Sequence, residues 1–210
     1  MNTAIVFGCG SGRGATITNM LLSQNYKVIN IGSQLHDQCE NIVVDWRHLN
    51  IHNLHQFLPK VAKVDFLFFN QNSSSLDQGA FAPNQIDTVI QSWKLMKDWQ
   101  HSHWLSCQMP FLTIKYLTPV LGSASKIGWM LSSTMYSDRP EVGKFPDYSS
   151  QKYFNFLAMK SFAAYYETFG ILPDFCMPHS EDLLARFIIT ACNSRVHGKI
   201  FDMKKIGADN

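Results

Sequence analysis

Short apolar runs alternate along the chain with longer segments in which apolar residues recur at helical spacing. This alternation predicts parallel strands joined by helices that cover both faces of one sheet. Seven strands are expected, at Ala4–Phe7, Lys27–Ile31, Asn41–Val44, Asp65–Asn70, Lys126–Ser132, Leu172–Met177 and Lys199–Met203. Six helices are expected, at Ala15–Gln24, Ile51–Leu58, Asn84–Lys97, Trp99–Leu121, Tyr148–Phe169 and Ser180–Asn193. No repeat or linker interrupts the pattern, so residues 1–210 are predicted to form a single α/β domain with a doubly wound, seven-stranded parallel sheet.

The composition adds one hint about assembly. Charged residues make up 16% of the chain, below the roughly 25% that is usual for soluble domains, and aromatic residues make up 13%. A charge-poor surface is expected where part of it is buried in a homodimer or homotetramer. A surface that is simply rich in Asn, Gln and Ser would give the same composition, so both interpretations stay open.

Several classes of protein are disfavoured. The net charge is +2 and no basic stripe is present, so no nucleic-acid partner is expected. No apolar run reaches the 18 residues of a membrane span. The chain enters a strand-like run at Thr3 without a basic leader, so a cytoplasmic protein is expected. The five cysteines are scattered without metal-binding spacing and are expected to be reduced thiols: Cys9, Cys39, Cys107, Cys176 and Cys192.

A glycine-rich loop follows the first expected strand and precedes the first expected helix. Residues 8–14 read Gly-Cys-Gly-Ser-Gly-Arg-Gly. Glycines let the backbone turn tightly and let a phosphate approach the amides at a helix N-terminus, where the helix dipole is positive. No Gly-Lys-Ser/Thr closes the loop, so it is not a Walker loop.

A second motif lies in the C-terminal half. Tyr148 and Lys152 are four residues apart, about one helical turn, so they share one face of any helix that carries them. A nearby cation favours the ionised form of a phenol. Tyr148 is therefore a candidate proton donor or acceptor, although a solvated helix face would show the same spacing. A Ser132-Ser133 pair lies just upstream, at the end of an apolar run.

The glycine loop alone resembles two families, the short-chain dehydrogenases/reductases and the class I S-adenosylmethionine methyltransferases. The methyltransferase loop usually follows an acidic residue on strand one, and this strand reads Ala-Ile-Val-Phe. That family also expects an acid at the end of strand two, where this chain has Gly32-Ser33. A methyltransferase has no use for Ser133 followed by Tyr-x-x-x-Lys, so the rest of the chain favours the dehydrogenases.

The resemblance to short-chain dehydrogenases/reductases extends over nearly the whole chain and implies a Rossmann-type fold. Asp45, followed by Trp46, matches the family's acid that contacts the adenine, although a helix N-cap is the alternative for Asp45. Asn70 matches the second Asn of the segment after strand four. Ser133 takes the catalytic serine position, fifteen residues before Tyr148, although a strand-end hydroxyl tied to neighbouring backbone is its alternative.

What the resemblance implies is hydride transfer between a nicotinamide ring and a small carbonyl or alcohol substrate. Tyr148 would give or take the proton of the substrate oxygen, Ser133 would hold that oxygen, and Lys152 would bind the ribose hydroxyls. The cofactor-binding residues implied are Gly8, Gly10, Ser11, Gly12, Arg13, Gly14, Ser33, Asp45, Trp46, Asn70, Tyr148, Lys152 and Pro178. Ser33 replaces the acid of NAD-preferring members and Arg13 lies in the glycine loop, so NADP is preferred and NAD stays possible. Arg13 facing solvent is the alternative.

The chain also departs from the family. Ser106 takes the position of the Asn that completes the catalytic tetrad, and Phe7 replaces the Thr before the first glycine. The Pro-Gly turn after strand six becomes Pro178-His179, and the following helix is expected at Ser180, so the substrate-covering segment is predicted to be missing. A lid excludes water and sets specificity. The alternative function is therefore a non-catalytic dinucleotide-binding protein with a regulatory or assembly role.

Overall fold

The structure is a computed structural model that describes residues 1–10, 12–70, 100–136, 146–173 and 180–206. Seven parallel strands form one sheet in the order β3-β2-β1-β4-β5-β6-β7. The strands are β1 Asn2–Phe7, β2 Tyr26–Gly32, β3 Glu40–Val43, β4 Val64–Phe69, β5 Leu121–Met130, β6 Glu167–Leu172 and β7 Lys199–Asp202. The helices are α1 Gly12–Ser23, α3 Met109–Leu117, α4 Pro146–Phe162, α5 Ser180–Asn193 and α6 Met203–Ile206. The predicted seven-stranded α/β fold is confirmed.

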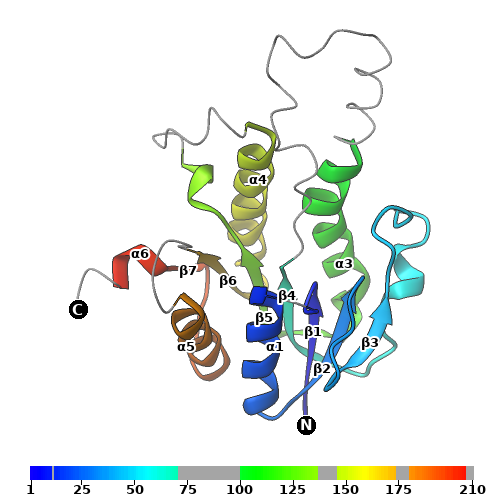
Figure 1. Ribbon diagram of the computed structural model, residues 1–210, viewed down its shortest axis with the longest axis horizontal. Helices are drawn as coiled ribbons and strands as arrows, with labels where there is room; N and C mark the ends of the chain where they lie inside the picture. Colours follow the sequence, from blue (N-terminus) through cyan, green and yellow to red (C-terminus); the bar gives the residue numbers. More distant parts are fainter. Residues whose placement is uncertain (11, 71–99, 137–145, 174–179, 207–210) are drawn as a thin grey trace, which may run out of the picture.

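The helices cover both faces of the sheet, with α1 and α5 on one side and α3 and α4 on the other (Figure 1). Each face has its own buried cluster, because successive residues of a strand point to opposite faces. In β1, Ile5 and Phe7 pack on the side of α3 and α4, whereas Ala4 and Val6 pack on the side of α1 and α5. Burial on both faces explains why the strands read as continuous apolar runs.

The sheet order fixes where a ligand can lie. The chain runs outward from β1 to β3 and then returns to β4 on the other side of β1. At such a reversal the loops after the two central strands diverge and leave a crevice at the carboxyl edge of the sheet. The glycine loop follows β1 and Asn70 follows β4, so both lie at this reversal.

The centre of the sheet is packed by aromatic rings. Phe66 and Phe68 of β4 lie 5.7 and 5.9 Å from the ring of Phe169 on β6. Gly128 of β5 lies between these strands, and a Cβ at this position would overlap the rings of Phe68 and Phe169. The missing side chain of Gly128 therefore makes room for the ring cluster.

Strand six begins and ends five residues earlier than predicted. The helix α4 stops at Phe162, not at Phe169, and β6 runs from Glu167 to Leu172. Gly170 lies inside the strand, where a Cβ would overlap the side chain of Leu131. Pro173 lacks the N–H that a continuing ladder needs, which explains why the strand ends there.

Two helix predictions also differ. The segment Ile51–Leu58 forms only a 3₁₀ turn at Leu54–Phe57, because Asn50 and Asn53 side chains bond to nearby backbone groups and favour turns. The expected helix Trp99–Leu121 is interrupted by a π-helical turn at Trp104–Gln108 and ends in a 3₁₀ turn at Thr118–Val120. The expected helix Asn84–Lys97 lies outside the described residues.

Within the described part of the chain, no helix is long and apolar enough to cross a membrane. The four cysteines within it, Cys9, Cys39, Cys107 and Cys192, form no disulfide, in keeping with the expectation of reduced thiols.

Replacing Gly128 with Ala should destabilise the protein, because the added methyl would push apart the rings of Phe68 and Phe169. Overpacking of this kind costs about 1–3 kcal/mol, which lowers the midpoint of thermal unfolding by about 2–12 °C. Gly122→Ala is the matched control on the same strand, since a Cβ there meets nothing within 4 Å. Calorimetry that gave equal melting temperatures for both variants would contradict this description of the core.

Candidate functional site

The glycine loop is tied to its neighbours by backbone and amide hydrogen bonds. Gly8 has a φ of 82°, which favours glycine, and its N–H donates to the Ile31 carbonyl over 2.9 Å. Asn70 Nδ2 donates to the Gly8 carbonyl over 2.9 Å, and Asn70 N donates to the Phe7 carbonyl over 3.1 Å. Asn70 therefore holds the loop from the end of β4, which is a positioning role.

The geometry of the loop fits a bound phosphate. A Cβ on Gly14 would overlap the Gly8 carbonyl oxygen, so only glycine lets α1 pack this closely on the end of β1. Gly12 opens α1 with a φ of 52°, and a Cβ there would meet nothing within 4 Å. Open space thus borders the first turn of α1, where backbone amides attract anions.

The Tyr148 and Lys152 pair lies on the first turns of α4, as predicted. The ammonium of Lys152 is 4% exposed and donates to the Met130 carbonyl, at the end of β5, over 2.9 Å. It also lies 5.4 Å from the centroid of the Tyr148 ring, within cation–π range. Burial, helped by the nearby charge of Arg13, lowers the pKa of Lys152 to about 8. The half-buried Tyr148 therefore lies beside an ammonium, that of Lys152, whose pKa of about 8 is close to neutral pH.

The two serines after β5 differ in the hydrogen bonds of their hydroxyls. Ser132 caps the 3₁₀ turn Ser133–Met135, and its Oγ accepts from Thr134 N over 3.3 Å and from Thr134 Oγ1 over 3.0 Å. The strand-end hydroxyl tied to neighbouring groups is therefore Ser132. Ser133 is half-buried in a turn that packs against α4, and its hydroxyl forms no side-chain hydrogen bond to another described residue.

Arg13, from the glycine loop, lies near the Tyr148 and Lys152 pair. Its guanidinium is half-buried and interacts electrostatically with Tyr148 and Lys152. Burial lowers the pKa of Arg13, an effect that the charge of Tyr148 opposes. Arg13 also lines a cavity of about 220 Å³ with Gly12, Pro173 and Glu181. Ser33 lines a different pocket.

The π-helical turn brings two buried residues against α4. Ser106, the predicted stand-in for the family's Asn, and Cys107 are both buried there. Cys107 Sγ lies 4.0 Å from the Gln151 carbonyl oxygen, and Cys107 interacts electrostatically with Lys152. The position of Cys107 beside Lys152 was not predicted from the sequence, because a single inserted residue in a helix leaves no periodic signal.

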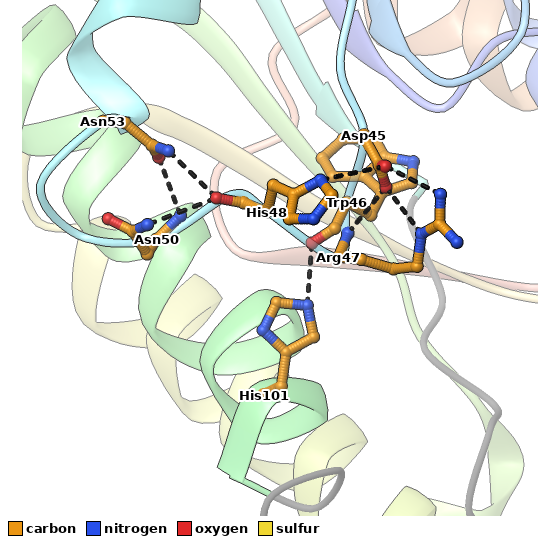
Figure 2. A network of polar contacts seen from close by, with 7 residues as sticks. All are labelled: Asp45, Trp46, Arg47, His48, Asn50, Asn53 and His101. Carbon is orange, nitrogen blue, oxygen red and sulfur yellow. Dashed lines mark hydrogen bonds and ion pairs between the residues drawn. The ribbon is translucent and has the colours of Figure 1, made fainter.

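An open pocket of about 440 Å³ lies at the carboxyl ends of β2 and β3, lined by Ser33, Val43, Val44, Asp45, Trp46 and Arg47. The carboxylate of Asp45 contacts the Arg47 guanidinium and, at 3.1 Å, His48 Nδ1 (Figure 2). The hydrogen bonds from Arg47 hold the pKa of Asp45 well below its usual range. Asp45 Oδ1 also accepts from Arg47 N over 3.0 Å, so the capping alternative is partly realised in a turn. Arg47, two residues after Asp45, was missed, although an Asp-x-Arg spacing is a usable signal.

Two predicted site residues, Ser11 and Pro178, lie outside the described residues, as does His179. The Pro178 assignment rested on a strand six placed five residues too late; in the structure Pro173 directly follows β6. Seven residues join Leu172 to Ser180, so the connection is longer than the sequence pattern indicated. Among the described residues, no group of three or more His, Cys, Asp or Glu could hold a metal ion.

The buried ammonium of Lys152 should make stability depend on pH. Its pKa in the folded protein, about 8, lies below the ordinary value of 10.5. The unfolded chain therefore binds more protons between pH 8 and 10.5, and stability rises with pH through this window. Relative to Lys152→Met, the free energy of unfolding of the unmodified chain should rise by about 3 kcal/mol from pH 8 to pH 10.5. Urea unfolding at several pH values measures this difference.

Lys160→Met is the control for the lysine prediction, because Lys160 lies on the exposed side of the same helix and donates to the Gly198 carbonyl over 2.8 Å. A surface substitution of this kind should change stability by less than about 0.5 kcal/mol. A flat difference for Lys152→Met across the window would mean that its ammonium is hydrated.

Comparisons with known proteins support the fold. No family model and no curated protein sequence match the chain. Among solved structures, an oxidoreductase of the short chain dehydrogenase/reductase family from Brucella ovis, in complex with a partially ordered NAD, aligns at a TM-score of 0.74 and 17% identity, covering 96% of this chain and 98% of that one. A carbonyl reductase from Pseudomonas aeruginosa aligns at a TM-score of 0.70 and 11% identity, covering 97% of both chains. BdcA in complex with NADPH aligns at a TM-score of 0.71 and 12% identity, covering 96% of this chain and 92% of that one.

These identities are low, and the likeness therefore concerns the arrangement of the backbone. The shared features are the seven-stranded parallel sheet and the helices on both of its faces. The chain thus has the fold of the short-chain dehydrogenases/reductases.

Proposed function

We propose that this protein is a dinucleotide-dependent oxidoreductase that transfers a hydride between nicotinamide and a carbonyl or alcohol. The observation that carries this proposal is the buried Lys152 ammonium beside the Tyr148 ring, at the carboxyl edge of the sheet that also holds the glycine loop. A proton-transfer group and a phosphate-binding loop at one edge fit this reaction class. The cofactor would supply or accept the hydride.

Each residue then has a definite task. The Tyr148 hydroxyl would exchange a proton with the substrate oxygen, and the Ser133 hydroxyl would donate a hydrogen bond to that oxygen. The Lys152 ammonium has donors beyond the one used on the Met130 carbonyl, and these would hold the ribose hydroxyls.

The neighbouring structures support a nicotinamide dinucleotide without deciding which one. The structure from Brucella ovis holds NAD, and BdcA holds NADPH. For this chain we propose NADP, since Ser33 directly follows β2, at a position where an acid would repel a 2′-phosphate.

A non-catalytic dinucleotide-binding protein is the second candidate. Ser106, which is buried in the π-helical turn, favours it, because a hydroxyl is shorter than the amide that relatives use and lacks its second polar group. The two candidates differ in what the Tyr148 hydroxyl does, so turnover separates them.

We also propose that the protein self-associates through the outward face of α4. The inward face of its first half is polar, with Ser149, Gln151, Lys152 and Asn155 buried. Its outward face is apolar, with Tyr153, Phe154 and Leu157 48%, 39% and 45% exposed. Covering this face with the same face of a second copy would bury apolar area.

Tyr148→Phe should abolish turnover while retaining the dinucleotide, because it removes only the hydroxyl. Loss of general acid–base catalysis lowers kcat by about 10²- to 10⁴-fold. NADPH oxidation with aldehydes, ketones and quinones measures the rate, and calorimetry measures binding. Tyr153→Phe, five residues further along α4 on its exposed side, is the matched control and should retain full activity.

Two results would count against this function. If the unmodified chain binds NADPH and turns over none of the substrates, the non-catalytic candidate gains. If neither NADPH nor NADH binds, the dinucleotide function itself is wrong.

Phe154→Ser combined with Leu157→Ser should shift the protein towards monomers, because both side chains lie on the apolar face of α4. Sedimentation velocity at several concentrations measures the oligomeric state. Tyr165→Ser is the control, since Tyr165 is 71% exposed but lies beyond the end of α4. A monomeric unmodified chain, or an oligomer that the double variant leaves intact, would refute this interface.

A further inference from the structure

The pocket at the ends of β2 and β3 is built around an arginine whose orientation is fixed. Arg47 Nε donates to Asp45 Oδ1 over 3.0 Å and Arg47 Nη2 donates to Asp45 Oδ2 over 2.8 Å. Two parallel bonds between a guanidinium and a carboxylate set both the position and the plane of the cation. Figure 2 shows the guanidinium extended alongside Asp45, on the other side of the carboxylate from His48.

The segment that carries Arg47 is itself held in place. His101 Nε2 donates to the Trp46 carbonyl over 2.7 Å, which ties the segment to the helix before α3 (Figure 2). On the far side, Asn53 Nδ2 donates to the His48 carbonyl over 2.9 Å. Val44 N donates to the Gly32 carbonyl over 3.0 Å, which fixes the segment to the end of β2 beside Ser33. The separation of Arg47 and Ser33 is therefore set by the fold.

Both polar groups retain hydrogen-bonding capacity. A guanidinium has five N–H groups, and the two side-chain bonds to Asp45 use two of them. The Arg47 side chain is 83% exposed, so the remaining donors are accessible from the pocket and from solvent. Ser33 is exposed and its hydroxyl forms no side-chain hydrogen bond to another described residue. An arginine and a hydroxyl on one pocket are suited to a tetrahedral oxyanion.

The remaining lining residues indicate what carries the oxyanion. Val43, Val44 and Trp46 give the pocket an apolar wall, which suits the flat face of a purine ring. Asp45 contributes a negative charge, but its two oxygens are engaged by Arg47 and His48. Glu40 at the start of β3 is paired with Lys27 over 2.7 Å, and Asp37 lies in the preceding turn. The pocket thus combines an apolar wall with one oriented cation.

We propose that Arg47, held by Asp45, and Ser33 together bind the 2′-phosphate of an adenosine ribose, and so select NADP over NAD. This inference rests on the proposed dinucleotide function. It moves the selectivity from Arg13 to a residue outside the glycine loop, and it makes Asp45 a positioning residue.

The test measures binding, so it does not depend on turnover. Calorimetry with adenosine 2′,5′-bisphosphate, 5′-AMP, NADPH and NADH compares ligands that differ by the 2′-phosphate, and inorganic phosphate shows whether the oxyanion alone suffices. Arg47→Gln should weaken adenosine 2′,5′-bisphosphate and NADPH by about 10- to 100-fold, as expected for loss of a charged hydrogen bond. Binding of 5′-AMP and NADH should change by less than about 2-fold. Arg195→Gln, which alters an exposed arginine on a different surface groove, is the control.

The outcomes are distinguishable. If the unmodified chain binds NADPH no better than NADH, or if Arg13→Gln and not Arg47→Gln removes the preference, the inference is wrong and the dinucleotide function stands. If no dinucleotide binds, the proposed function fails and this inference fails with it. Arg47→Lys retains the charge but lacks the planar guanidinium that can form two parallel hydrogen bonds. It should therefore bind NADPH more tightly than Arg47→Gln but more weakly than the unmodified chain, whereas affinity equal to that of the unmodified chain would mean that charge alone suffices.

Discussion

The contact between the Lys152 ammonium and the Met130 carbonyl organises the candidate site. It joins the first turns of α4 to the end of β5, which are the elements that carry Tyr148 and Ser133. Moving an ammonium out of water is costly, and one hydrogen bond to a carbonyl recovers only part of that cost. The surrounding groups act on the ammonium in opposite directions: Cys107 of the π-helical turn raises the pKa of Lys152, whereas the like charge of Arg13 lowers it.

The carboxyl edge of the sheet explains why distant parts of the chain meet. In a parallel sheet every strand ends at the same edge, so the residues that follow β1, β2, β3, β4 and β5 are gathered there by topology. The structure divides this edge into two regions. Arg13, Tyr148 and Lys152 interact at one, and Ser33, Asp45 and Arg47 line the other. The glycine loop, at the reversal of strand order, lies on the route between them.

Much of this could be predicted from the sequence, for identifiable reasons. Apolar runs buried on both faces specify strands, and glycines with positive φ specify the loop after β1. The errors came where local preference and packing disagree. The helix that was expected to reach Phe169 ends at Phe162, and Gly170 makes room for Leu131 in the middle of β6. Arg13 and Ser33 both indicated NADP in the sequence, which does not tell that the two residues line different pockets. The position of Cys107 beside Lys152 could not be predicted, because it depends on an extra residue in one helical turn.

The two halves of α4 are anchored differently. Its second half buries Met159 and packs Phe156 and Phe162 against the core, whereas its first half buries polar groups. Ser149 Oγ and Asn155 Oδ1 are buried there without a hydrogen-bond partner among the described residues. Each such group forfeits about 1–3 kcal/mol relative to a satisfied one. Native-state hydrogen exchange would therefore divide the helix into two cooperative units, and the amides around Tyr148 and Lys152 would open at a lower free energy than those around Met159.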